Sequence, residues 1–129
     1  MYSSFEDLEV WRRSCSLAVR VYEVLKSCRD YGLKDQMTRA AVSIASNIAE
    51  GAERDSILEY IHFLHIAKGS AAELRTQLII ASRIGAVPEE VQQLLVEELR
   101  MISKQLQGLA AYLKTRIKPK SGHTAEAIK

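Results

Sequence analysis

Three residues near the middle of the chain have the types and the spacing of metal ligands. Glu59 and His62 form a Glu-x-x-His pair, and His65 follows three positions later. On a helix, residues three apart share a face, so the two imidazoles could hold one metal ion. A di-iron site in a helical bundle needs a second Glu-x-x-His pair, and the sequence has none. The simpler interpretation places both histidines at the surface, and we expect no metal and no cofactor.

The sequence does not indicate catalysis. It contains no phosphate loop, dinucleotide fingerprint or zinc-protease motif. Cys15 and Cys28 lie 13 positions apart on or at the end of one expected helix. A continuous helix would separate them by about 20 Å, and a disulfide needs Cα atoms within about 7 Å. We therefore expect two free thiols and a protein that is not an enzyme.

Basic residues are the second candidate for chemistry. Residues 114–129 carry five basic groups against one acidic group, whereas residues 1–113 carry 13 basic and 15 acidic groups. The basic run could neutralise the phosphates of a nucleic acid, or it could serve solubility alone. Further basic residues, seven and eight apart, define one stripe of the third expected helix, which could equally be a solvated face. The candidate nucleic-acid-binding residues are Lys68, Arg75, Arg83, Lys114, Arg116, Lys118 and Lys120.

Apolar residues that recur every three to four positions predict four helices. We expect the first over about residues 5–27, capped by Ser4, and the second over about 33–50, after a loop in which Gly32 is free to take positive φ. The third begins at the Ser56 capping box and ends at Gly85. The fourth starts with Pro88 in its first turn and ends before Pro119.

The buried face of each helix follows from the same spacing. For the first helix we expect one central stripe, widened by the neighbouring valines and Leu17; it consists of Leu8, Trp11, Cys15, Ala18, Tyr22 and Leu25. For the third helix the alternation is strict from Ile57 to Ala81 and is the strongest periodic signal in the chain. Gly51 is expected to end the second helix, and Gly69 to mark a close approach of another group.

Short connections make consecutive helices antiparallel neighbours. The fold class is therefore all-α, an antiparallel up-down-up-down four-helix bundle over residues 1–117, followed by a basic, disordered tail over 118–129. No window approaches the roughly 18 uninterrupted apolar residues of a membrane span. With no secretory signal at the N-terminus, we expect a cytoplasmic protein without a membrane partner.

Polar residues on the second and third helices allow two interpretations. They could form a hydrogen-bonded network between the helices, or a surface that meets another subunit. The residues in question are Ser43, Ser46, Asn47, Glu50, Glu73 and Gln77.

Segments spread over residues 5–113 carry a family resemblance. They include Phe5-Glu-Asp-Leu8-x-Val10-Trp11, Arg39-Ala-Ala-Val-Ser-Ile44, Ser46-Asn-Ile-Ala-Glu-Gly51, Arg54-x-Ser56 and Glu59-Tyr60. In this order they resemble the bacterial four-helix-bundle proteins encoded in 23S ribosomal RNA intervening sequences. The family signature residues, whose role is unassigned, are Arg39, Asn47, Glu50, Gly51 and Arg54.

The resemblance implies a four-helix protomer in a ring-like homopentamer, associated with ribosomal RNA. A related set of bundles serves as accessory proteins to reverse transcriptases of diversity-generating retroelements. Two positions depart from the family pattern. Ala45 replaces a frequent proline, so a kink there is in doubt, and Thr38 replaces a second basic residue before Arg39.

Two functions remain open from the sequence. In the first, a non-enzymatic oligomer binds ribosomal or other structured RNA through its basic surface, with repeated patches that add avidity. In the second, the bundle is a protein-interaction module, such as an accessory subunit of a nucleic-acid enzyme, without direct contact to nucleic acid.

Overall fold

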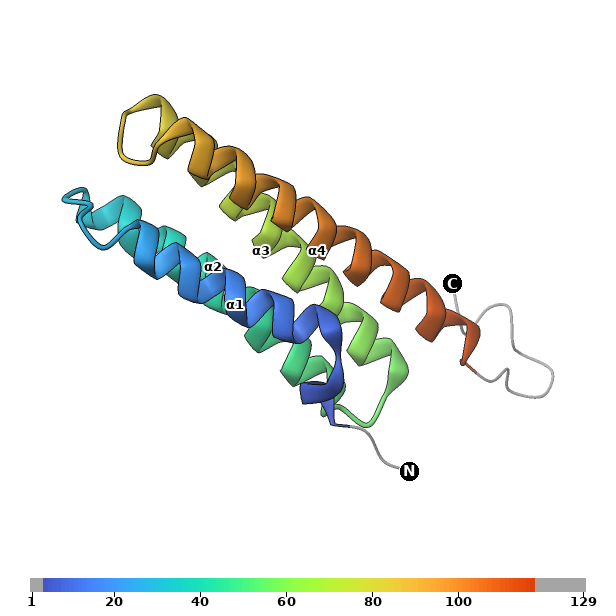
Figure 1. The fold of residues 1–129 in the computed structure, drawn as a ribbon. Coiled ribbons are helices and arrows are strands. Elements are labelled where there is room, and N and C mark those ends of the chain that lie inside the picture. Colours follow the sequence, from blue (N-terminus) through green and yellow to red (C-terminus); the bar gives the residue numbers. More distant parts are fainter. Residues whose placement is uncertain (1–3, 118–129) are drawn as a thin grey trace.

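Four helices and one short 3-10 turn make up the described part of the protein. The computed structural model describes residues 4–117, and the elements are η1 (Phe5–Asp7), α1 (Glu9–Val24), α2 (Tyr31–Ala52), α3 (Ile57–Arg83) and α4 (Glu89–Thr115) (Figure 1). No strand occurs within residues 4–117. The all-α prediction is confirmed. The predicted tail over 118–129 lies outside the described residues.

The helices pack in chain order and close into a bundle. α1 packs against α2, α2 against α3 and α3 against α4, and α1 also contacts α4. Figure 1 shows the α1–α2 pair beside the α3–α4 pair. Arg13 of α1 forms an ion pair with Glu98 of α4 at 2.9 Å, and Gln105 of α4 donates to Glu9 of α1 at 3.2 Å. The up-down-up-down bundle is thus confirmed.

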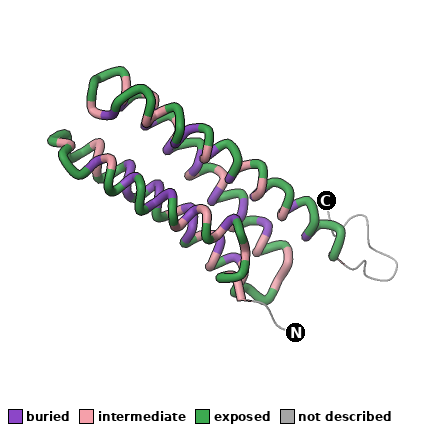
Figure 2. Tube along the Cα trace, in the orientation of Figure 1, coloured by how far each residue is buried: buried purple, intermediate pink, exposed green. Residues whose placement is uncertain are grey.

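Two helices bury the faces that their periodicity predicts. Every α3 position of the strict alternation from Leu64 to Ala81 is buried. On α4 the buried residues also recur every three to four positions, and they include Leu95, Leu99, Ile102, Leu106, Ala110 and Leu113. Figure 2 shows such buried positions along all four helices. None of the helices within residues 4–117 has the length and apolar character that crossing a membrane requires.

The first helix differs from its prediction in two ways. η1 and an extended Leu8 precede α1, which begins at Glu9 and ends at Val24, although Ser4 does cap η1 by accepting from the Glu6 amide. The predicted stripe is also only partly buried: Ala18 and Leu25 are buried as predicted, whereas Tyr22 is 52% exposed. Leu8, Trp11 and Cys15 are half-buried. The residues α1 buries are Val10, Ser14, Leu17, Ala18 and Val21.

Ser14 explains why the buried row of α1 is hard to recognise in the sequence. It is a polar residue in the core, and its hydroxyl donates to the Val10 carbonyl one turn earlier at 2.7 Å. A hydroxyl satisfied by its own helix can be buried without losing a hydrogen bond. The periodic pattern therefore has a gap at Ser14, whereas the row through Trp11 and Cys15 is continuously apolar.

The glycines also correct the prediction. Gly32 lies in the first turn of α2, which Asp30 caps by accepting from the Leu33 amide at 3.1 Å, and positive φ occurs at Gly85. Gly51 does not end α2, which continues to Ala52. Gly69 meets no close neighbour, since a Cβ added there would have no atom within 4 Å.

Candidate nucleic-acid interface

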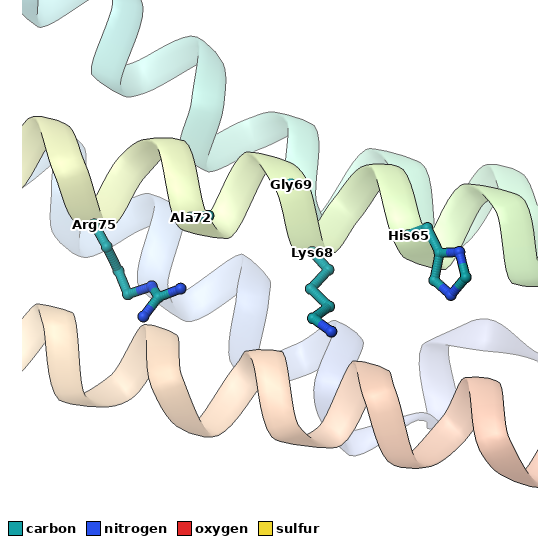
Figure 3. A pocket seen from close by; sticks show the side chains of 5 residues that line it. All are labelled: His65, Lys68, Gly69, Ala72 and Arg75. Atoms are coloured by element: carbon teal, nitrogen blue, oxygen red, sulfur yellow. The ribbon is translucent and has the colours of Figure 1, made fainter.

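An open hollow on α3 gathers three basic or titratable side chains. His65, Lys68 and Arg75 line it, with Gly69 and Ala72 between them, and it encloses about 440 Å³ (Figure 3). The spacing of three, four and three residues places positions 65, 68, 72 and 75 on one helical face. Because the two central residues are small, the helix backbone is accessible between the cations.

The contacts of Lys68 and Arg75 leave their charges available. Both side chains reach from α3 toward α4 (Figure 3), where the Lys68 ammonium donates to the neutral Gln107 amide oxygen at 3.2 Å. Arg75 is half-buried, and its Nε has no hydrogen-bond partner among residues 4–117. A buried donor without a partner is uncommon in folded proteins and calls for an explanation.

No carboxylate neutralises this cluster. Elsewhere within residues 4–117 the cations of Arg13, Arg39 and Arg100 each have a carboxylate oxygen within 4.0 Å. In the described part of the chain, no ion pair involves Lys68 or Arg75. The hollow therefore carries uncompensated positive charge on a bundle whose first 113 residues are slightly acidic overall.

The structure separates the other predicted basic residues from the hollow. Arg83 is exposed at the last position of α3, and Lys114 and Arg116 are exposed at the end of α4. Lys118 and Lys120 lie outside the described residues. The predicted stripe of three residues on α3 is thus reduced to Lys68 and Arg75.

His65 lines the hollow with these two cations, although the sequence indicated it only as a metal ligand beside His62 or as a surface residue. The spacing of three between His65 and Lys68 is the sequence signal for this position. Both histidines and Glu59 are exposed, as the simpler interpretation predicted, and Ser56 caps α3 by accepting from the Glu59 amide at 3.3 Å. Residues 4–117 contain no cluster of three or more potential metal ligands.

Part of the polar set on α2 joins α2 to α3. The Ser43 and Ser70 hydroxyls share a hydrogen bond of 2.9 Å, and the Asn47 amide donates to the carbonyl and the hydroxyl of Ser43 at 2.8 and 2.9 Å. The interhelical-network interpretation is confirmed for Ser43, through its hydrogen bond to Ser70, whereas Asn47 bonds to Ser43 within α2. Ser46, Glu50 and Glu73 are exposed instead.

The signature residues do not form one site. Arg39 pairs with Asp35 of its own helix at 2.9 Å, whereas Arg54 stacks over the Phe63 ring of α3 at 4.7 Å from its centroid. Fifteen positions of helix and turn separate these two arginines. Gly51 lets α3 approach closely, since its added Cβ would meet Phe63 Cβ at 2.8 Å. Gly51 and Arg54 thus lie against α3, whereas Asn47 hydrogen-bonds to Ser43 of its own helix.

The two departures from the family pattern have plain structural consequences. α2 runs as one helix through Ala45. Thr38 is 7% exposed, and its hydroxyl donates to the carbonyls of Lys34 and Asp35 at 2.9 and 3.1 Å. Thr38 therefore adds nothing to a charged surface beside Arg39.

A second surface is an apolar groove between α1 and α2. It encloses about 410 Å³, and its lining residues are Phe5, Trp11, Cys15, Ala18, Val42, Ala45, Ser46 and Ala49. Phe5 and Trp11 meet edge to face, with ring centroids 5.3 Å apart. Burial raises the pKa of the Cys15 thiol. Cys15 and Cys28 are both free, as predicted.

Comparison with known proteins places this architecture in a family. The fold and its surfaces define an all-α up-down bundle with a cationic hollow on α3 and an apolar groove between α1 and α2. The family model described as 23S rRNA-intervening sequence protein matches residues 6–108. The chain therefore belongs to this family.

A solved structure supports the same conclusion. The chain is similar to a protein of unknown function from the S23 ribosomal protein family of Bacteroides thetaiotaomicron, with 26% identity and a TM-score of 0.74. The match covers 78% of this chain and 97% of that one. Among curated proteins, none matches this sequence.

Proposed function

We propose that this protein is a non-enzymatic, self-associating bundle that binds structured RNA through the cations of α3. The observation that carries the proposal is the hollow lined by His65, Lys68 and Arg75, in which no carboxylate of residues 4–117 forms an ion pair with Lys68 or Arg75. Uncompensated cations on an otherwise neutral surface favour a polyanion. The family description refers to 23S rRNA, and that of the similar structure to a ribosomal protein family, which agrees with an RNA partner.

Self-association would make a modest site effective. One protomer offers few cations, and residues 1–113 are slightly acidic, so each copy alone binds weakly. Identical sites on a ring, as the family resemblance implies for a homopentamer, would engage one RNA together and raise the avidity.

The apolar groove between α1 and α2 is the surface on which we place a second copy. Exposed apolar side chains adjoin it on both helices: Val19 is 59%, Tyr22 52% and Val42 42% exposed. A contiguous apolar surface of this kind is typical of contacts between subunits.

The mass of the particle in solution tests this interface. We expect wild-type protein to be an oligomer in light scattering, and Val42→Asp to shift it toward monomer. Leu94→Asp on α4, a residue 63% exposed and outside the groove, is the matched control and should leave the mass unchanged. A monomeric wild type, or a Val42→Asp variant of unchanged mass, contradicts the interface.

The same groove also favours the second candidate, a protein-interaction module that serves a nucleic-acid enzyme. Crosslinking in the native cell, with sequencing of bound RNA and mass spectrometry of bound protein, separates the two. Enrichment of structured RNA supports the proposed function. Enrichment of a polymerase without RNA supports the module, and enrichment of neither contradicts both.

A further inference from the structure

We propose that the hollow on α3 holds a short run of sugar–phosphate backbone lying along the helix, with one phosphate near His65 and Lys68 and a neighbouring phosphate near Arg75. The inference rests on the proposed function and deepens it, because it replaces a general basic surface with a defined subsite. The chemistry recognised is two adjacent phosphate groups of one nucleic-acid strand.

The length of the hollow fits this ligand. Lys68 and Arg75 lie seven residues apart, which corresponds to about 10 Å of helix rise. That span is too long for one phosphate to contact both side chains symmetrically, and it suits adjacent phosphates of one strand. His65 lies one turn from Lys68 on the same face and adds an imidazole at that end.

The small residues between the cations give the backbone room. A Cβ added at Gly69 would meet no atom within 4 Å, and Ala72 contributes a single methyl group to the lining. A sugar can therefore approach the helix where a long side chain would exclude it. This explains a glycine inside a 27-residue helix, a position that costs about 1 kcal/mol relative to alanine.

The two cations are prepared for an anion in different ways. Arg75 is half-buried, forms no ion pair within residues 4–117, and has a planar guanidinium that matches the geometry of a phosphate. Within residues 4–117, the Lys68 ammonium donates to the neutral oxygen of Gln107, a hydrogen bond that a phosphate oxygen can replace. The Gln107 amide also carries N–H donors of its own, which can turn to the same anion.

The decisive variant changes the shape of the hollow and leaves its charge intact. Gly69→Leu fills the space between the cations, and the open surroundings of Gly69 should let the variant fold. Gly108→Leu is the matched control, because Gly108 is also helical, exposed and without a close neighbour, and it does not line the hollow. The probes are a fluorescent RNA hairpin, followed by anisotropy, and a dinucleotide with a 5′-phosphate, which carries two adjacent strand phosphates, followed by calorimetry.

Charge variants complete the experiment. Lys68→Gln with Arg75→Gln removes both cations, and Arg20→Gln with Lys26→Gln removes the same charge from exposed positions of α1 and the turn after it. We expect Gly69→Leu, and the double variant at Lys68 and Arg75, each to weaken RNA binding by about tenfold or more. The double variant should also reduce the slope of log affinity against log salt concentration by about two. Both controls should stay within about twofold of wild type.

The outcomes distinguish this inference from the proposed function. If Gly69→Leu binds RNA like wild type and the two double variants lose equal affinity for RNA, the subsite is wrong. RNA binding through the general positive charge of the surface then stands. If wild type binds the 5′-phosphorylated dinucleotide but not the RNA hairpin, and Gly69→Leu abolishes that binding, the subsite stands for a short single strand and the proposed binding of structured RNA fails. If neither probe binds, both are wrong.

Discussion

Replacing Gly51 by alanine tests how α2 and α3 are packed. The residue is buried inside α2, at the point where α3 crosses it. An added Cβ would lie 2.8 Å from Phe63 Cβ, 3.0 Å from Tyr60 Cδ1 and 3.1 Å from the Tyr60 carbonyl oxygen. Two of these three atoms are a Cβ and a main-chain oxygen, so the clash cannot be relieved by rotating a side chain. The main chain of α3 must shift.

The expected free energy follows from two opposing effects. Overpacking a tight contact costs about 1–3 kcal/mol. Alanine recovers about 1 kcal/mol through its better helix propensity, so Gly51→Ala should lose up to about 2 kcal/mol. Gly108→Ala is the control: Gly108 is exposed within α4 and its Cβ would meet nothing within 4 Å, so this variant should gain about 1 kcal/mol.

Urea unfolding followed by far-ultraviolet circular dichroism measures both variants. Protein concentration must be held constant, because unfolding of an oligomer depends on it. The same substitution should act with opposite sign at the two glycines, with a difference of about 1–3 kcal/mol in the free energy of unfolding. Equal stabilisation of both variants would refute the close approach of α3 at Gly51.

Two further predictions concern α1. In a Cys28→Ser background, the rate at which iodoacetamide alkylates Cys15 should still rise above about pH 9. Burial raises the pKa of this thiol and leaves little thiolate at neutral pH. A rate that reaches its plateau below about pH 8 contradicts this. A double-mutant cycle with alanine at Arg13 and Glu98, measured by urea unfolding, should give a coupling free energy of about 0.5–1 kcal/mol, since the ion pair is only partly exposed. A coupling free energy of zero would show that the pair does not hold α1 to α4.

The buried face of a helix was predictable where the apolar residues lie on a single face. α3 keeps an unbroken alternation from Ile57 to Ala81, and only one helical face can bury it. α1 has two apolar rows side by side, and periodicity cannot decide between them. The packing of α2 and α4 selects the row that contains Ser14, and the row through Trp11 and Cys15 becomes the wall of the apolar groove.

Glycine has several structural roles that sequence alone does not separate. Gly51 is followed by polar residues and resembles a helix stop, yet it is needed because Phe63 and Tyr60 of α3 lie against it. From the sequence, Gly69 is expected where another group approaches the helix, yet a Cβ added there would meet no atom within 4 Å. These differences depend on which residues of a neighbouring helix lie opposite, and that is set by the register between helices.

The candidate site was predictable only in part. Lys68 and Arg75 share a face by their spacing, which the sequence shows. The burial of Arg75 Nε, the contact of Lys68 with Gln107 and the charge balance of the hollow depend on the position of α4. No feature of the sequence indicates that Arg13 finds a carboxylate across the bundle while these two cations do not.

The salt dependence of RNA binding by the protein tests the central claim most directly. If Lys68 and Arg75 contact two phosphates, the affinity of a protomer for an RNA hairpin should fall by about tenfold between roughly 50 and 200 mM KCl, and by more for a ring that engages several sites. An affinity that stays constant over this range would contradict binding through phosphate contacts.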